Sequence, residues 1–152
     1  MEKKKKRVLF TVLKVLGAFF AVIAGGTALQ VRRGLSFLKK KGSNQNAMTC
    51  TAISCSSATI GKDIEVGAFS SLLGCLSVSW EEAPDHAFDL DLCSAFSMLS
   101  VIVPSNLRVV CDVKSVGGMV SNHTEAPEDE NAPVLQITGK AICGMIVIRN
   151  AE

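Results

Sequence analysis

Apolar and polar residues are distributed in two different ways along this chain. Residues 8–29 form an apolar run of 22 residues that contains a single charge, Lys14. At about 1.5 Å per residue such a run makes a helix roughly 33 Å long, enough to cross a hydrocarbon core of about 30 Å. From Thr49 onward, apolar residues instead recur at every second position, as in segments 89–93 and 109–113. The pattern predicts one N-terminal transmembrane helix followed by short strands.

A short block recurs five times after the first quarter of the chain. Each copy begins with an apolar anchor that is followed by small residues or Met, and the anchors are Ile53, Leu73, Phe96, Val116 and Ile142. The anchors stand 20, 23, 20 and 26 residues apart. Repeats of this length with a short strand in each copy are typical of stacked β architectures. We therefore predict that the five anchors line one continuous core.

Small residues inside the blocks predict tight corners between the strands. They are Gly74, Ser97, Gly117, Gly118 and Gly144. Because Gly and Ser carry little or no side chain, the backbones of neighbouring copies can approach each other closely there. The predicted fold is therefore all-β, a right-handed, β-helix-like coil of short stacked strands, preceded by one N-terminal transmembrane α-helix.

The chain divides into three predicted parts. Residues 1–41 are a basic segment and membrane anchor, residues 42–48 a polar linker that frees the domain from the membrane surface, and residues 49–152 the repeat domain. A secretory signal peptide also has a basic start and an apolar middle. The length of the apolar run, and the bases that follow it in place of a cleavage site, favour a retained anchor. We expect a single-pass protein of the cell membrane.

The side of the membrane on which the domain lies stays open. Five bases precede the apolar run and five follow it, so the distribution of positive charge is nearly balanced. Lys14 and the amino terminus favour a cytoplasmic N-terminus, which would place the domain outside. The six cysteines show no disulfide-scaffold spacing and suit a reducing compartment instead: Cys50, Cys55, Cys75, Cys93, Cys111 and Cys143.

Charge argues against nucleic acid as a partner. Residues 42–152 contain five bases and thirteen acids, and an acidic domain repels phosphate. The remaining bases flank the apolar run, where they suit anionic lipid headgroups. Membrane lipids, contacted through the N-terminal helix, are therefore the expected partners of this part of the chain.

Residues with catalytic chemistry are scarce. His86 and His123 have no Cys or Ser at the spacing of a known catalytic motif, and the cysteine spacing does not fit zinc. Carboxylates gather between Glu81 and Asp91, which is typical of a solvated outer face. We predict no enzyme, no metal and no cofactor. The alternative is an envelope enzyme or ligand-binding protein with its site in the loops at 81–91.

Three stretches resemble a known family. Residues 140–150 match the closing repeat of the LiaF-type C-terminal (toast-rack) domain of bacterial cell-wall-active antibiotic response proteins, and residues 95–104 and 115–120 match other copies. The resemblance covers residues 52–150. The family's Phe-Gly-Gly core is nowhere intact here, and family members with a regulatory role usually carry several membrane spans. The resemblance implies a toast-rack fold and a place in the bacterial cell envelope.

These observations together predict a membrane-anchored interaction or scaffold module of the bacterial cell envelope. The resemblance implies a role in envelope-stress sensing or signalling. The expected partner is a second copy of the chain or an envelope protein such as a sensor kinase. Because the last strand has no successor to cover it, we expect the interaction edge at Met145, Ile146 and Arg149.

Overall fold

The computed structural model describes residues 2–151, with side chains from Phe10 onward. The predicted basic segment at residues 2–7 therefore lies outside the part whose side chains are described. This part of the chain forms one helix, α1 (Glu2–Lys41), and ten strands. The strands are β1 (Asn46–Thr51), β2 (Cys55–Ile60), β3 (Val66–Ser71), β4 (Cys75–Trp80), β5 (Phe88–Ala95), β6 (Met98–Val103), β7 (Arg108–Val116), β8 (Met119–His123), β9 (Val134–Ile142) and β10 (Met145–Asn150).

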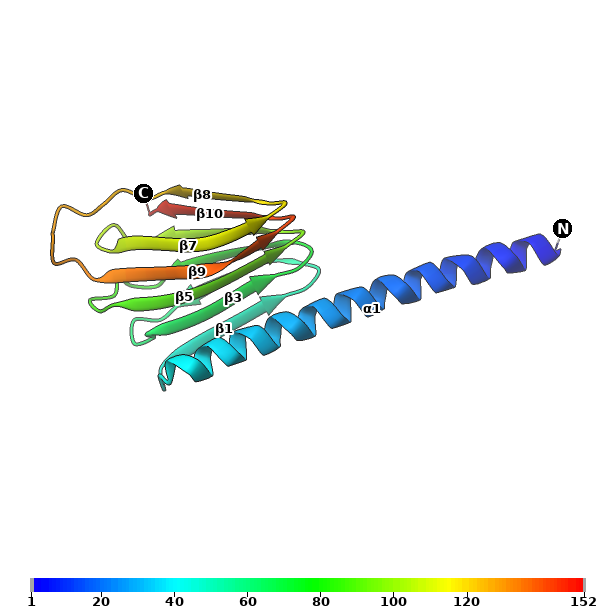
Figure 1. The fold of residues 1–152 in the computed structure, drawn as a ribbon, viewed down its shortest axis with the longest axis horizontal. Coiled ribbons are helices and arrows are strands. Elements are labelled where there is room, and N and C mark those ends of the chain that lie inside the picture. The colour runs from blue at the N-terminus through cyan, green and yellow to red at the C-terminus, as the bar shows by residue number, and fades with distance from the viewer. Residues whose placement is uncertain (1, 152) are drawn as a thin grey trace.

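Consecutive strands lie in opposite sheets (Figure 1). The odd-numbered strands form sheet A, in the order β1-β3-β5-β9-β7, and the even-numbered strands form sheet B, in the order β2-β4-β6-β10-β8. All neighbouring strands are parallel. A short corner joins each odd strand to the next even strand, and we call each such pair a unit, from unit 1 (β1–β2) to unit 5 (β9–β10). The prediction of an all-β domain that follows one N-terminal helix is confirmed.

The order of the units differs from their order in the sequence. Unit 5 lies between units 3 and 4, so that β10 pairs with β6 on one side and with β8 on the other. The prediction of an interaction edge at Met145, Ile146 and Arg149 is therefore wrong, and Ile146 is fully buried. The long connection at 124–133 allows the chain to pass unit 4. The last two strands then enter the interior of the sheets, β9 in sheet A and β10 in sheet B.

The core lies between the two sheets and follows the period-two pattern of the sequence. Every second residue of the inner strands points into it, and most of these side chains are at most 2% exposed. Burying a side chain of this size stabilises the fold by about 1.5–3 kcal/mol. The largest members are Ile60, Leu76, Val78, Phe88, Leu90, Leu92, Leu99, Leu107, Leu135, Ile137, Ile146 and Ile148.

The five repeat anchors lie at the corners and not in the core. Ile53, Phe96 and Val116 are 58%, 62% and 61% exposed, Ile142 is 37% exposed, and only Leu73 is partly buried. The prediction that they line a continuous core is therefore wrong. The block marks the place where the chain leaves one sheet for the other, and a side chain at such a turn points away from the space between the sheets.

The corners leave little room for side chains, as the small residues of the blocks predict. A Cβ atom on Gly74 would overlap the backbone of Ser54, and one on Gly118 would overlap that of Gly144. A Cβ on Gly144 would lie 2.7 Å from the carbonyl oxygen of Ser97. Backbones of adjacent units therefore stack in contact at this end of the domain.

Candidate functional site

The second half of α1 packs against the outer face of sheet A. Ile23, Gln30, Gly34 and Leu38 are buried at intervals of one or two helical turns, and they face β1, β3 and β5. The helix ends at Lys41 and is followed by Gly42, whose backbone has a φ of 69° and whose N–H donates to the carbonyl of Leu38 over 3.1 Å. The prediction of a linker that frees the domain is therefore wrong.

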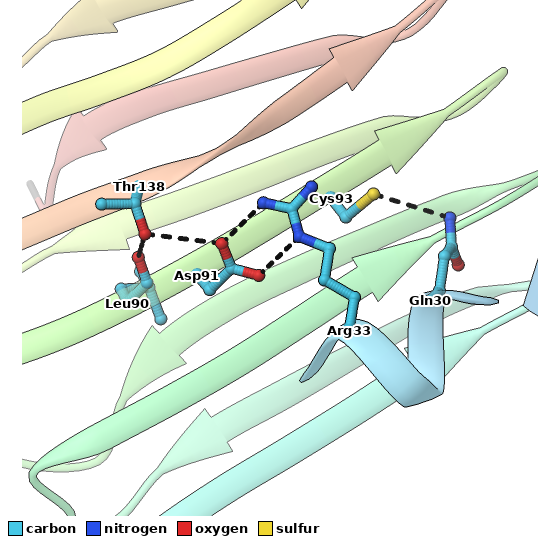
Figure 2. Close-up of polar contacts among 6 residues, drawn as sticks. All are labelled: Gln30, Arg33, Leu90, Asp91, Cys93 and Thr138. Carbon is cyan, nitrogen blue, oxygen red and sulfur yellow. Dashed lines mark hydrogen bonds and ion pairs between the residues drawn. The ribbon is translucent and has the colours of Figure 1, made fainter. Parts of the chain in front are cut away.

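An ion pair fixes the helix to the sheet (Figure 2). The Arg33 Nη2 and Nε atoms donate to the two carboxylate oxygens of Asp91 over 2.8 and 3.1 Å. The Asp91 side chain is 8% exposed, and the Thr138 hydroxyl donates to it over 3.4 Å. A two-point, charge-assisted contact of this kind sets orientation as well as distance. The sequence does not predict this pair, because Asp91 belongs to the group of carboxylates whose pattern is typical of a solvated face.

A buried amide continues this contact along the helix. The Gln30 amide nitrogen donates to the carbonyl of Ser71 over 3.3 Å and lies 4.0 Å from the Cys93 sulfur. The Cys50 thiol in turn faces the Gln30 amide oxygen at 3.7 Å. Burial raises the pKa of the Cys93 thiol, so that it stays protonated and unreactive at neutral pH. These groups help to hold α1 against sheet A.

A cavity of about 270 Å³ lies beside the ion pair, between α1 and sheet A. Its lining is mainly apolar and includes one corner residue from each of units 2, 3 and 5, namely Leu72, Ala95 and Ile142. The other lining residues are Gly26, Leu29, Gln30, Arg33, Cys93 and Lys140. Gln30 and Arg33 already have partners on the sheet. Such a lining suits an apolar chain better than a polar substrate.

The expected loop site at 81–91 is a loop only over 81–87, at the end of the domain opposite the corners, and residues 88–91 are the first residues of β5. The Asp85 carboxylate lies 3.3 Å from His86 Nδ1, and His86 Nε2 donates to the Ile64 carbonyl over 3.0 Å. These contacts raise the pKa of His86 and lower that of Asp85. Asp89 pairs with Lys41 over 2.8 Å. In the described part of the chain, no three His, Cys, Asp or Glu residues are grouped so that they could hold a metal ion.

Two cysteines of neighbouring units form a disulfide. Cys55 and Cys75 begin β2 and β4 and occupy the same register position. The interpretation of the cysteines as thiols of a reducing compartment is wrong for these two. A signal for the pair was present, because both cysteines occupy the same place in consecutive blocks, 20 residues apart. Cys50, Cys93, Cys111 and Cys143 are free thiols.

Unit 4 forms an open edge of both sheets. β7 pairs with β9, and β8 pairs with β10, so their outer sides face solvent in the described structure. At the other edge, α1 packs along β1 while β2 remains open. Unit 4 therefore replaces β10 as the candidate edge for adding a strand.

No family model, no curated protein and no solved structure matches this chain, so the resemblance to the LiaF-type domain stays a prediction.

Proposed function

We propose that this protein is a membrane-anchored interaction module of the bacterial cell envelope, and that it binds its partner at the edge of unit 4. The observation that carries the proposal is the ion pair between Arg33 and Asp91. This pair joins a helix of membrane-spanning length directly to the sheet. Tether and domain then form one body, and the edge of unit 4 is held at a set orientation to the membrane.

The exposed half of α1 supports a retained anchor. The helix from Phe10 to Lys41 contains an 18-residue window with a mean hydropathy of 2.0, of which only 6% is buried. Phe10, Phe19, Phe20 and Val22 are 52–72% exposed, and lipid is the environment that covers such side chains. A signal sequence has a similar composition. However, Ile23 belongs to the same apolar run and is buried against Leu72 and Ala95, so removing the run would also remove part of the fold.

The disulfide supports a position of the domain outside the reducing cytoplasm. Disulfides persist in oxidising compartments, and the bridge between Cys55 and Cys75 joins two strands of sheet B. Lys14 and the basic N-terminus favour the same topology, with the N-terminus inside.

We also propose that the units form a toast-rack coil, as the family resemblance implies, with unit 5 inserted between units 3 and 4.

The edge of unit 4 combines unpaired backbone groups with charged side chains that restrict which strand can pair with it. β7 is nine residues long and presents Arg108, Asp112 and Lys114 to solvent. Charges on an edge strand oppose indiscriminate pairing, so a partner strand needs complementary charges to bind. A second copy of the chain, or an envelope protein such as a sensor kinase, is the proposed partner.

Site-specific crosslinking of the full chain in its membrane tests this proposal. A photoreactive residue replaces Val110, which is exposed on β7, and a matched probe replaces Leu35, which is exposed on α1. We expect the Val110 probe to capture a second copy or one defined envelope protein, and the Leu35 probe to capture neither. If Val110 captures nothing while a probe at Glu82 traps a small molecule, the ligand-binding alternative replaces the interaction module.

A further inference from the structure

Exposed apolar side chains of the β domain gather at its corners. Six of the large hydrophobic residues that are at least 37% exposed lie in a corner or begin the strand after it. We call them the corner row: Ile53, Phe96, Met98, Val116, Met119 and Ile142. The segments that form the corners, 52–54, 72–74, 95–97, 115–118 and 141–144, contain no charged residue. A concentration of exposed apolar side chains at one end of a domain is typical of an interaction site.

Phe96 is a large exposed residue at a corner position whose backbone is left-handed in three units. Its φ is 52°, in the left-handed region that bulky residues rarely adopt, and its ring is 62% exposed. The same register position holds Cys143 with a φ of 49° and Gly117 with a φ of 66°. Since Gly satisfies this position in unit 4, a strained and exposed Phe in unit 3 points to a role outside the fold.

The corners lie at the end of the sheets from which α1 leaves the domain (Figure 1). Ile23 packs against Leu72 and Ala95, which are corner residues of units 2 and 3. A Cβ atom on Gly26 would meet the Leu72 side chain at 3.2 Å. The helix therefore passes the corners between Ile23 and Gly26, and everything before Ile23 projects beyond them.

The length of the projecting helix favours a position of the corners at the bilayer surface. Apolar residues 8–22 account for only about 22 Å at 1.5 Å per residue, against a hydrocarbon core of about 30 Å. The whole run at 8–29 is roughly 33 Å long and matches the core. Because its last residues run alongside the corners, a matched span immerses the corner row.

Charges are arranged to fit the same orientation. The first basic residues behind the corners on the open half of sheet A are Lys114 and Lys140, which are exposed neighbours in register. The opposite end of the domain carries nine acids in the connections between units, against the five bases Lys39, Lys40, Lys41, Lys62 and Arg108, so this end is acidic overall and an anionic surface would repel it. The nine acids are Asp63, Glu65, Glu81, Glu82, Asp85, Glu125, Glu128, Asp129 and Glu130.

We propose that the corner row is a lipid-binding surface that inserts into the interfacial layer of the membrane holding α1. Lys114 and Lys140 then lie at the level of anionic headgroups. The domain is held against the membrane at two places, by the helix and by the row of corners. This inference rests on the proposed membrane anchoring and adds a second membrane contact to it.

Fluorescence quenching by brominated lipids tests the corner row in the full chain. The Phe96→Trp variant is reconstituted into vesicles of phosphatidylcholine and phosphatidylglycerol that carry bromine near the glycerol end of the acyl chains. The matched control is Val134→Trp, at an exposed position at the opposite end of the domain. The native Trp80 packs against Phe88, also away from the corners, and gives the background. We expect bromine to quench the emission of Trp at position 96 and to leave the control and the native chain unchanged.

The outcomes separate this inference from the proposed function. Quenching at position 96 that weakens in a Lys114→Gln/Lys140→Gln background supports both insertion and headgroup contact. If the chain stays with the vesicles but bromine does not quench Trp at position 96, the corner row does not touch lipid, and the inference is overturned while the anchor stands. If the chain does not associate with vesicles at all, the proposed anchoring and this inference both fall.

Discussion

Removal of Arg33 should loosen the whole protein, because it leaves the Asp91 carboxylate without its ion-pair partner inside the helix–sheet contact. In an Arg33→Met variant only Thr138 still donates to that carboxylate, over 3.4 Å. Breaking a fully buried pair costs about 3–5 kcal/mol. The Arg33 side chain is 32% exposed, so solvent screens part of the charge, and we expect a loss of about 2–3 kcal/mol in the free energy of unfolding.

Two variants control for the loss of side-chain packing and for general charge effects. Arg33→Met combined with Asp91→Leu removes both charges and should recover most of the lost stability. Lys41→Met breaks the pair with Asp89, whose two side chains are 40% and 31% exposed, and should cost less than about 1 kcal/mol.

Urea denaturation of the detergent-solubilised full chain, followed by Trp80 fluorescence, measures these differences. With a slope of about 1–3 kcal/mol per molar urea, the Arg33→Met midpoint should fall by about 0.7–3 M. The reasoning is refuted if Arg33→Met and Lys41→Met shift the midpoint equally, or if adding Asp91→Leu to Arg33→Met restores nothing. Either result would mean that the ion pair does not fix the helix to the sheet.

Two further predictions concern the core and the disulfide. Phe88 is 1% exposed and Phe96 is 62% exposed, so thermal unfolding should show a loss of about 3–5 kcal/mol for Phe88→Ala and less than about 1 kcal/mol for Phe96→Ala. Equal losses of unfolding free energy in the two variants would show that Phe96 belongs to the core. The bridge between Cys55 and Cys75 closes a loop of 20 residues, and replacing both with Ser should cost about 3 kcal/mol under oxidising conditions. The same replacement should cost little in reductant, and a loss that is independent of reductant would show that the bridge does not form.

The sequence alone determined the strands and the identity of much of the core. Leu90 and Leu92, or Leu99, Val101 and Val103, alternate with other residues, and a strand places every second side chain on one face whatever its neighbours are. The apolar run likewise determined a helix of membrane-spanning length, because length and composition decide that property. The small corner residues were also readable, since close backbone approach excludes larger side chains at any such turn.

Only the tertiary structure decided how these elements are arranged. Backbone hydrogen bonds between parallel strands are alike for every pair, so the local sequence of β10 does not specify that it lies between β6 and β8. The anchors repeat as a core would, yet only the turn between sheets shows that they point outward. The contact of Arg33 with Asp91 joins residues 58 positions apart, and its geometry exists only once α1 lies on sheet A. Local patterns fix which face of an element is apolar, whereas the packing of distant segments decides what that face meets.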